Sequence, residues 1–131
     1  MKILIVGNGA RESALALKLR DDSRISKLYF AKGTVTTAEL GQNVYDESVE
    51  GLRDFAIKER IDLTIVGPEA PLVEGIVDEF KKHGLKIFGP EKRAAELEGS
   101  KAFSKKFMQT NNIKTAKAVV FDAYHDAIEY V

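Results

Sequence analysis

The sequence lacks cysteine and tryptophan, and it has only two histidines and three prolines in 131 residues. Without cysteine, neither a disulfide framework nor a thiolate metal site can form. The two histidines, His83 and His125, are far apart in the chain and have no metal-ligand spacing. Net charge is absent as well, because twenty basic and twenty acidic residues cancel. No block of like charge indicates a nucleic acid or an anionic membrane surface as partner.

Long hydrophobic segments are also missing. No apolar run approaches the roughly 20 residues that a membrane-spanning helix requires, and no signal or transit pattern precedes the first apolar segment. The length suffices for one domain with a hydrophobic core. We therefore expect a soluble, cytoplasmic protein whose partners include neither a membrane nor a nucleic acid.

The most informative segment lies at the start of the chain. Residues 3–6 are four branched apolar residues, and the turn Gly7-Asn8-Gly9 follows them directly. Such a run is typical of a central strand in a parallel sheet, because helices cover both faces of that strand. The glycines leave amide groups uncovered beside the positive end of the next helix, where phosphate commonly binds, and Arg11 can add a bidentate contact. The segment indicates an anion site, although a turn that only joins strand to helix fits it too.

Strand patterns and amphipathic helix patterns alternate as far as Pro90. We expect strands over residues 3–6, 27–31, 43–45, 61–66 and 85–88, and helices over residues 11–21, 48–59 and 71–83. Pro71 suits the first position of the last of these helices, and Gly84 ends it. The stretch 35–47 is otherwise without a clear pattern. This alternation predicts an α/β protein with an open, mostly parallel sheet and right-handed crossovers.

Four of the expected strands end at a glycine, namely Gly7, Gly33, Gly67 and Gly89. Ligands of open α/β sheets bind in the crevice beyond the carboxyl ends of the strands. Four glycine turns at that edge agree with a ligand crevice. They agree equally with ordinary connections between strands and helices.

The pattern changes after Pro90. Residues 91–98 and 100–111 are expected to form consecutive helices, and Ser100 can cap the second. A strand over 118–121 and a helix over 124–131 follow, and a lone strand with a helix buries little surface. We therefore predict one complete α/β domain over residues 1–99, a linker helix over 100–112, and the truncated start of a further domain over 113–131.

Four blocks of sequence together resemble one enzyme family. They are GNGARE at residues 7–12, VGPEAPLV at 66–73, FGP at 88–90 and LEGSKAFSK at 97–105. In this order and spacing they are similar to the phosphoribosylamine–glycine ligase family, with similarity over all 131 residues. The resemblance implies a Rossmann-like pre-ATP-grasp domain followed by the start of an ATP-grasp lid subdomain.

The resemblance also implies a ligase of de novo purine biosynthesis. Family members join glycine to 5-phosphoribosylamine, use ATP with Mg²⁺ or Mn²⁺, and release glycinamide ribonucleotide, ADP and phosphate. They are much longer than this chain, and their ATP-grasp and C-terminal domains supply the metal ligands and most of the nucleotide site. Residues 1–131 alone are therefore expected to be inactive, with no catalytic or metal-binding residue among them.

Particular residues are implied to face the substrates. The first substrate loop contains Asn8, Gly9, Arg11 and Glu12, the second contains Gly33, and the third contains Pro68 and Glu69. Amides and a guanidinium can hold a phosphate, and a carboxylate can hold ribose hydroxyls or an amine. Lys105 matches a family lysine that reaches the ATP phosphates. Without the resemblance, a solvated helix face would explain Lys105 together with Lys101.

Four positions depart from the family pattern. The family usually has glycine at Ala10, histidine at Ser13, proline at Lys32 and asparagine at Thr34. The alanine methyl narrows the room for a phosphate, whereas Thr34 can still donate a hydrogen bond and Ser13 can bond within its helix turn. We interpret these changes as variation within the family that alters substrate affinity; the alternative is a relative that has lost activity.

The main alternative is a stand-alone nucleotide- or NADP-binding domain with a sensing or redox role. The dinucleotide fingerprint requires a third glycine where Glu12 stands, and an acidic residue about 20 positions further on. The second expected strand instead ends in Ala31-Lys32-Gly33, where Lys32 would suit a 2′-phosphate. These two mismatches favour the ligase.

Overall fold

The computed structural model describes residues 1–130, which divide into two compact units, residues 1–95 and residues 96–130. The division falls inside helix α6 (Lys92–Gly99). The domain boundaries expected at residues 99 and 112 remain predictions. The first unit carries all the predicted substrate residues except Lys105.

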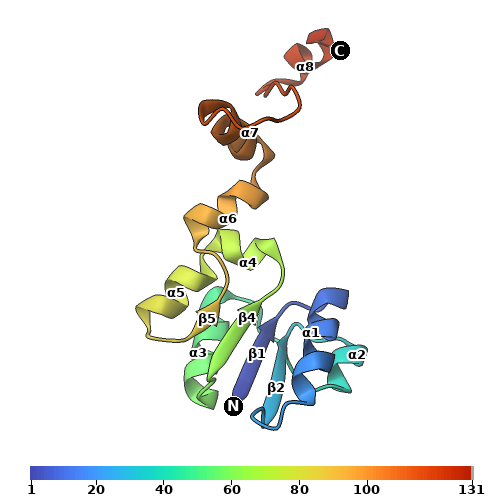
Figure 1. Ribbon diagram of the computed structural model, residues 1–131, viewed down its shortest axis with the longest axis vertical. Coiled ribbons are helices and arrows are strands. Elements are labelled where there is room, and N and C mark those ends of the chain that lie inside the picture. Colours follow the sequence, from blue (N-terminus) through green and yellow to red (C-terminus); the bar gives the residue numbers. More distant parts are fainter. Residues whose placement is uncertain (131) are drawn as a thin grey trace. The chain divides into compact units, whose positions relative to one another are not determined.

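The first unit is built around a five-stranded sheet with the order β3-β2-β1-β4-β5 and parallel neighbours throughout. The strands are β1 (Lys2–Val6), β2 (Lys27–Ala31), β3 (Gln42–Val44), β4 (Leu63–Val66) and β5 (Ile87–Phe88). Figure 1 shows β2, β1 and β4 side by side, with β1 in the middle. The expected α/β class and open parallel sheet are confirmed.

Helices cover both faces of this sheet, and this explains the unbroken apolar run of β1. The main covering helices are α1 (Ala10–Arg20), α3 (Val49–Glu59) and α5 (Ile76–Lys82). On one face Ile5 packs in a cluster with Ala16 of α1. On the other, Leu4 packs in a cluster with Leu52 of α3 and Phe80 of α5. Because successive strand side chains point to opposite faces, residues 3–6 of β1 must all be apolar.

An ion pair joins α3 to α5. Nη1 of Arg53 lies 2.6 Å from Oε1 of Glu79, and both side chains are largely buried. The hydrogen bond from Arg53 holds the pKa of Glu79 below its usual value, although partial burial acts in the opposite direction. The pair therefore stabilises the fold above the usual glutamate pKa, and that contribution is lost as the pH falls through the lowered value.

The helix expected over residues 71–83 is two helices. They are α4 (Glu69–Glu74) and α5, separated by Gly75 at a φ of +101°, where the left-handed backbone ends the first helix. Pro71 is the third residue of α4 and not the first residue of a helix, so that prediction is wrong. Proline is accepted there because the N–H groups of the first helical turn have no partner within the helix.

The stretch without a clear pattern contains one short helix. This is α2 (Val35–Ala38), which begins after Thr34, whose side chain accepts a hydrogen bond from the amide of Thr37. Four residues are too few for helical periodicity to appear in the sequence. The cap at Thr34 is the one local signal that could have indicated it.

The second unit contains helices α7 (Lys101–Thr110) and α8 (Tyr124–Tyr130). Ser100 caps α7 as expected, because its Oγ accepts the amide of Phe103 at 3.2 Å. The strand expected over residues 118–121 is not formed, and this unit offers it no partner strand among its described residues. Residue 131, the last of the expected final helix, lies outside the described part. Among residues 1–130, no helix has both the length and the apolar composition for crossing a membrane.

Candidate functional site

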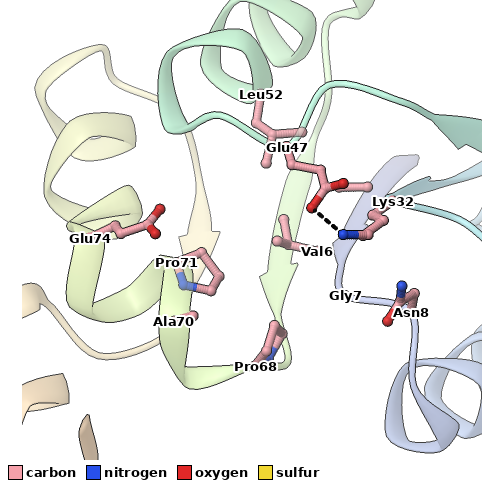
Figure 2. Close-up of a pocket in the computed structure, with 11 residues that line it drawn as sticks. Val6, Gly7, Asn8, Lys32, Glu47, Leu52, Pro68, Ala70, Pro71 and Glu74 are labelled. Carbon is pink, nitrogen blue, oxygen red and sulfur yellow. Dashed lines mark ion pairs between the residues drawn. The ribbon is translucent and has the colours of Figure 1, made fainter. Parts of the chain in front are cut away.

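A pocket of about 230 Å³ lies at the carboxyl ends of β1, β2 and β4, the edge at which the sequence predicts a ligand crevice. Figure 2 shows its lining side chains at the ends of these strands and on the loops after them, on the loop between β3 and α3, and on α3 and α4. The lining residues are Val6, Gly7, Asn8, Ala31, Lys32, Glu47, Leu52, Pro68, Ala70, Pro71 and Glu74. Asn8 and Pro68 are the two predicted substrate residues among them.

A second, more open hollow of about 530 Å³ adjoins the β1–α1 turn. Its lining residues are Asn8, Gly9, Ala10, Ser13, Ala14, Leu17, Thr34 and Thr36. Asn8 lines both hollows and therefore lies between them.

Glu12 is buried beneath the β1–α1 turn, with 4% of its surface exposed. Its Oε2 accepts a hydrogen bond from the amide of Gly9 at 2.6 Å. Glu12 is the third residue of α1, so this bond is the carboxylate half of a capping box. The Gly9 amide, which we expected to be free for an anion, thus already donates to a carboxylate of the protein. Glu12 lines neither hollow, and its contact with substrate remains a prediction.

The packing of Glu12 also accounts for two of the strand-end glycines. A Cβ on Gly67 would lie 1.9 Å from Oε1 of Glu12, and a Cβ on Gly7 would lie 2.9 Å from its Cδ. Gly7 also has a φ of +119°, which residues with side chains disfavour. The space that the Glu12 side chain occupies therefore explains why glycine stands at positions 7 and 67, whether or not a ligand approaches the turn.

Arg11 is exposed in the first turn of α1 and lines neither hollow. Its neighbours Ala10 and Ser13 line the second hollow. The first N–H groups of a helix have no partner within it, and the positive end of the helix dipole favours an anion there. Ser13 Oγ donates to the carbonyl of Gly9 at 3.1 Å, so this hydroxyl bonds within the helix turn as expected.

The second predicted loop, after β2, is held by an internal network. Nδ2 of Asn43 donates to the Thr34 carbonyl at 2.9 Å, and its Oδ1 accepts from Oγ1 of Thr37 at 2.9 Å. A Cβ on Gly33 would lie 1.8 Å from Oδ1 of Asn43. Glycine is therefore required for Asn43 to pack against the loop. A substrate contact at Gly33 stays a prediction.

The carboxylates in the first pocket are Glu47 and Glu74, both missed by the sequence analysis. The predicted carboxylate, Glu69, is exposed in the first turn of α4 and is not among the lining residues. Figure 2 shows Glu74 on α4, near Pro71. The position of Glu74 directly after the 66–73 block is a signal that could have identified it.

Lys32 is a further pocket residue that was not predicted to contact the ligase substrates. Its Nζ lies 3.0 Å from Oε2 of Glu47, and Figure 2 shows the two side chains meeting at the pocket. Lys32 directly follows β2, so its place at a strand end was readable from the sequence. Glu47 lies in the stretch without a clear pattern and gave no such signal.

Lys105 lies in the second unit, on α7. Its Nζ donates to Oγ1 of Thr115 at 2.6 Å and to the carbonyl of Ala116 at 3.0 Å. The ammonium therefore holds the segment after α7 to the helix in this structure. Its predicted contact with ATP phosphates is neither supported nor excluded by these bonds. In the described range 1–130, no three acidic, histidine or cysteine side chains converge as metal ligands.

Comparison with known proteins identifies the family of this chain. The family model described as phosphoribosylglycinamide synthetase, N domain, matches residues 1–98. The phosphoribosylamine–glycine ligase of Clostridium acetobutylicum is 52% identical over the whole chain, which covers 32% of that relative. The enzyme of the same name from Escherichia coli K12 is 48% identical, again with 32% of the relative covered. The chain thus spans about a third of the length of these relatives.

Solved structures agree with the fold. A crystal structure of phosphoribosylamine–glycine ligase from Thermotoga maritima matches 89% of this chain and 26% of its own, with a TM-score of 0.61 and 26% identity. The biotin carboxylase domain of a thermophilic 2-oxoglutarate carboxylase matches 99% of this chain and 32% of its own, with a TM-score of 0.66 and 15% identity. The second match concerns the fold alone. The family model covers three of the four blocks and the two relatives cover all four, which confirms the resemblance; the chain belongs to the phosphoribosylglycinamide synthetase N-domain family.

Proposed function

We propose that this chain is the N-terminal, substrate-binding part of an ATP-dependent ligase that joins glycine to 5-phosphoribosylamine. The observation that carries the proposal is that two of the family blocks, at residues 7–12 and 66–73, meet around one pocket at the carboxyl edge of the sheet. The name shared by relatives about half identical over the whole chain supports the same reaction. A cytoplasmic location is part of the proposal.

In the proposed reaction, the glycine carboxylate attacks the γ-phosphorus of ATP and releases ADP. The amine of phosphoribosylamine then attacks the resulting acyl phosphate, forms the amide of glycinamide ribonucleotide, and expels phosphate. Mg²⁺ or Mn²⁺ would supply charge neutralisation on the ATP phosphates. The described residues provide no cluster of metal ligands. We therefore assign the metal, the rest of the ATP site and catalysis to ATP-grasp and C-terminal domains of the same polypeptide.

The contribution of this chain is to hold the phosphoribosyl substrate. Arg11 and the free amides at the start of α1 suit a phosphate, through charge and through N–H donors. Asn8 lies between the two hollows and suits the ribose. Glu74, in the first pocket, can accept hydrogen bonds from hydroxyls or an amine. We retain Gly9, Glu12, Gly33, Pro68 and Glu69 as residues of the same substrate side, and Lys105 as a contact to ATP.

The dinucleotide alternative is disfavoured by Glu12. This residue stands where the fingerprint requires glycine, and its buried carboxylate lies under the turn that would have to approach a pyrophosphate. The fingerprint needs glycine at this position so that the helix packs closely against the strand, and the glutamate side chain occupies that space.

Calorimetric titration of the 131-residue chain with glycinamide ribonucleotide and with NADPH separates the two functions. We expect weak, saturable binding of glycinamide ribonucleotide, because one of several domains supplies the contacts, and no binding of NADPH. Glycinamide, which lacks the ribose phosphate, is the matched control and should not bind. Saturable binding of NADPH without binding of the ribonucleotide would overturn the proposal.

A further inference from the structure

Lys32 is held in an unusual backbone conformation at the edge of the pocket. Its φ is +54°, in the left-handed region that residues with side chains seldom occupy. A backbone hydrogen bond helps to fix this conformation, because the Lys32 amide donates to the carbonyl of Val44 at 2.9 Å. Strained conformations of this kind persist where the surrounding structure imposes them, and they concentrate at ligand sites.

This conformation places Lys32 beside the first substrate loop. The register of the sheet aligns Val6 with Ala31, so Gly7 and Lys32 are the next residues of two neighbouring strands. Both line the same pocket, together with Asn8. The ammonium of Lys32 is therefore on the same sheet edge as the turn to which we assign the substrate.

The partner of Lys32 holds it only weakly. The side chains of Lys32 and Glu47 are 61% and 51% exposed, and the pair is joined by a single 3.0 Å contact. Exposed pairs of this kind contribute little to stability, because water and salt screen both charges. A phosphate forms the same kind of charge-assisted bond to the ammonium, and near pH 7 a phosphate monoester carries more negative charge than a carboxylate. Glu47 can therefore be displaced by such a ligand.

The charges of the pocket show what an incoming anion meets. Among the described residues that line it, Lys32 is the cation, and Glu47 and Glu74 are the carboxylates. While Glu47 neutralises Lys32, the carboxylate of Glu74 is the remaining charge that these lining residues present to a ligand. An anion is accommodated when the Lys32 ammonium pairs with it in place of Glu47. The Glu47 carboxylate is then released to solvent.

We propose that the Lys32–Glu47 ion pair is a displaceable latch on this pocket. The phosphate of the ligand takes Lys32 from Glu47, so Lys32 joins Arg11 and the amides at the start of α1 as a contact to that phosphate, and Glu47 is its competitor. The inference rests on the proposed function, since it concerns the phosphate of the substrate assigned above. It assigns two specificity-determining residues outside the seven substrate residues that the family resemblance names.

The test compares two substitutions that each remove one charge and that should act in opposite directions. Binding of ribose 5-phosphate and of inorganic phosphate to the 131-residue chain is measured by NMR titration. Lys32→Gln should weaken binding about tenfold, since a charge-assisted bond is lost. Glu47→Gln should tighten binding about threefold or more, because the competitor becomes neutral. In the Lys32→Gln background, Glu47→Gln should change nearly nothing, which is the signature of competition for one lysine.

Two controls make the comparison specific. Lys81 and Glu91 form another exposed ion pair, at 2.6 Å, away from the pocket-lining residues. Lys81→Gln and Glu91→Gln repeat the same charge changes there and should leave both affinities unaltered. Lys32→Gly suits the left-handed backbone and should weaken binding as much as Lys32→Gln, which keeps the test valid if the glutamine variant folds poorly.

The possible results distinguish failure of the latch alone from failure of the proposed function. Equal affinities for the parent chain and the pocket variants would overturn the latch and leave the proposed function standing. Weaker binding in Glu47→Gln would also overturn the latch, because it would make Glu47 a ligand contact. Failure of every variant to bind ribose 5-phosphate, Glu47→Gln included, would contradict both.

Discussion

Replacing Glu12 with alanine is expected to lower the free energy of unfolding by about 2–4 kcal/mol, the range for a buried side chain whose loss leaves a cavity and an unpaired amide. The side chain fills the space between Gly7 and Gly67, and its Oε2 is the acceptor for the Gly9 amide. Alanine would leave that space empty and the Gly9 amide without its acceptor. The loss is measured by urea denaturation of the 131-residue chain, followed by circular dichroism.

Two further variants identify the cause of the loss. Glu12→Gln keeps the volume and an acceptor oxygen, so we expect a loss of about 1 kcal/mol, smaller than that of alanine. Glu50→Ala removes an exposed carboxylate from the first turn of α3 and should change stability by less than about 0.5 kcal/mol. An alanine variant at position 12 that is as stable as the parent would show that the carboxylate does not hold the turn.

The second large effect is expected from Arg11→Ala in the complete polypeptide that carries this chain. The KM for phosphoribosylamine should rise about tenfold or more, because a charge-assisted contact to the phosphate is lost. The KM for ATP should stay nearly constant, since Arg11 lies in the first turn of α1 and the ATP site is assigned to other domains. Steady-state kinetics with each substrate varied in turn provides the measurement.

Lys18→Ala is the control for this substitution. Lys18 is exposed in the last turn of the same helix, so its removal changes the charge of α1 equally, away from the substrate turn. We expect both KM values to stay within about twofold of the parent, as for other surface changes. An unchanged KM for phosphoribosylamine in Arg11→Ala would remove this residue from the site.

The sheet could be predicted from the sequence because its strands follow a strong local rule. Residues 3–6 are apolar without interruption, as a strand buried on both faces must be. The glycines at the strand ends likewise marked the edge at which the pocket lies. These features depend on residues close together in the chain, and the structure confirms them.

Features that depend on distant contacts could not be predicted. The burial of Glu12 depends on packing against Gly67, which is far away in the chain and close in the fold. The strand expected over residues 118–121 has suitable side chains, but a strand also needs a partner, and the described part of its unit has none. Lys32 directly follows β2 and Glu47 lies in the loop after β3. Their pairing depends on how the fold brings these two segments together.

The measurement that tests the account most directly is product formation by the complete polypeptide that carries this chain. The purified protein is incubated with glycine, phosphoribosylamine, ATP and Mg²⁺, and ADP and glycinamide ribonucleotide are quantified together. We predict equal amounts of the two products, and no ADP when either glycine or phosphoribosylamine is omitted. Formation of ADP without glycinamide ribonucleotide, or no turnover by a folded protein, would contradict it.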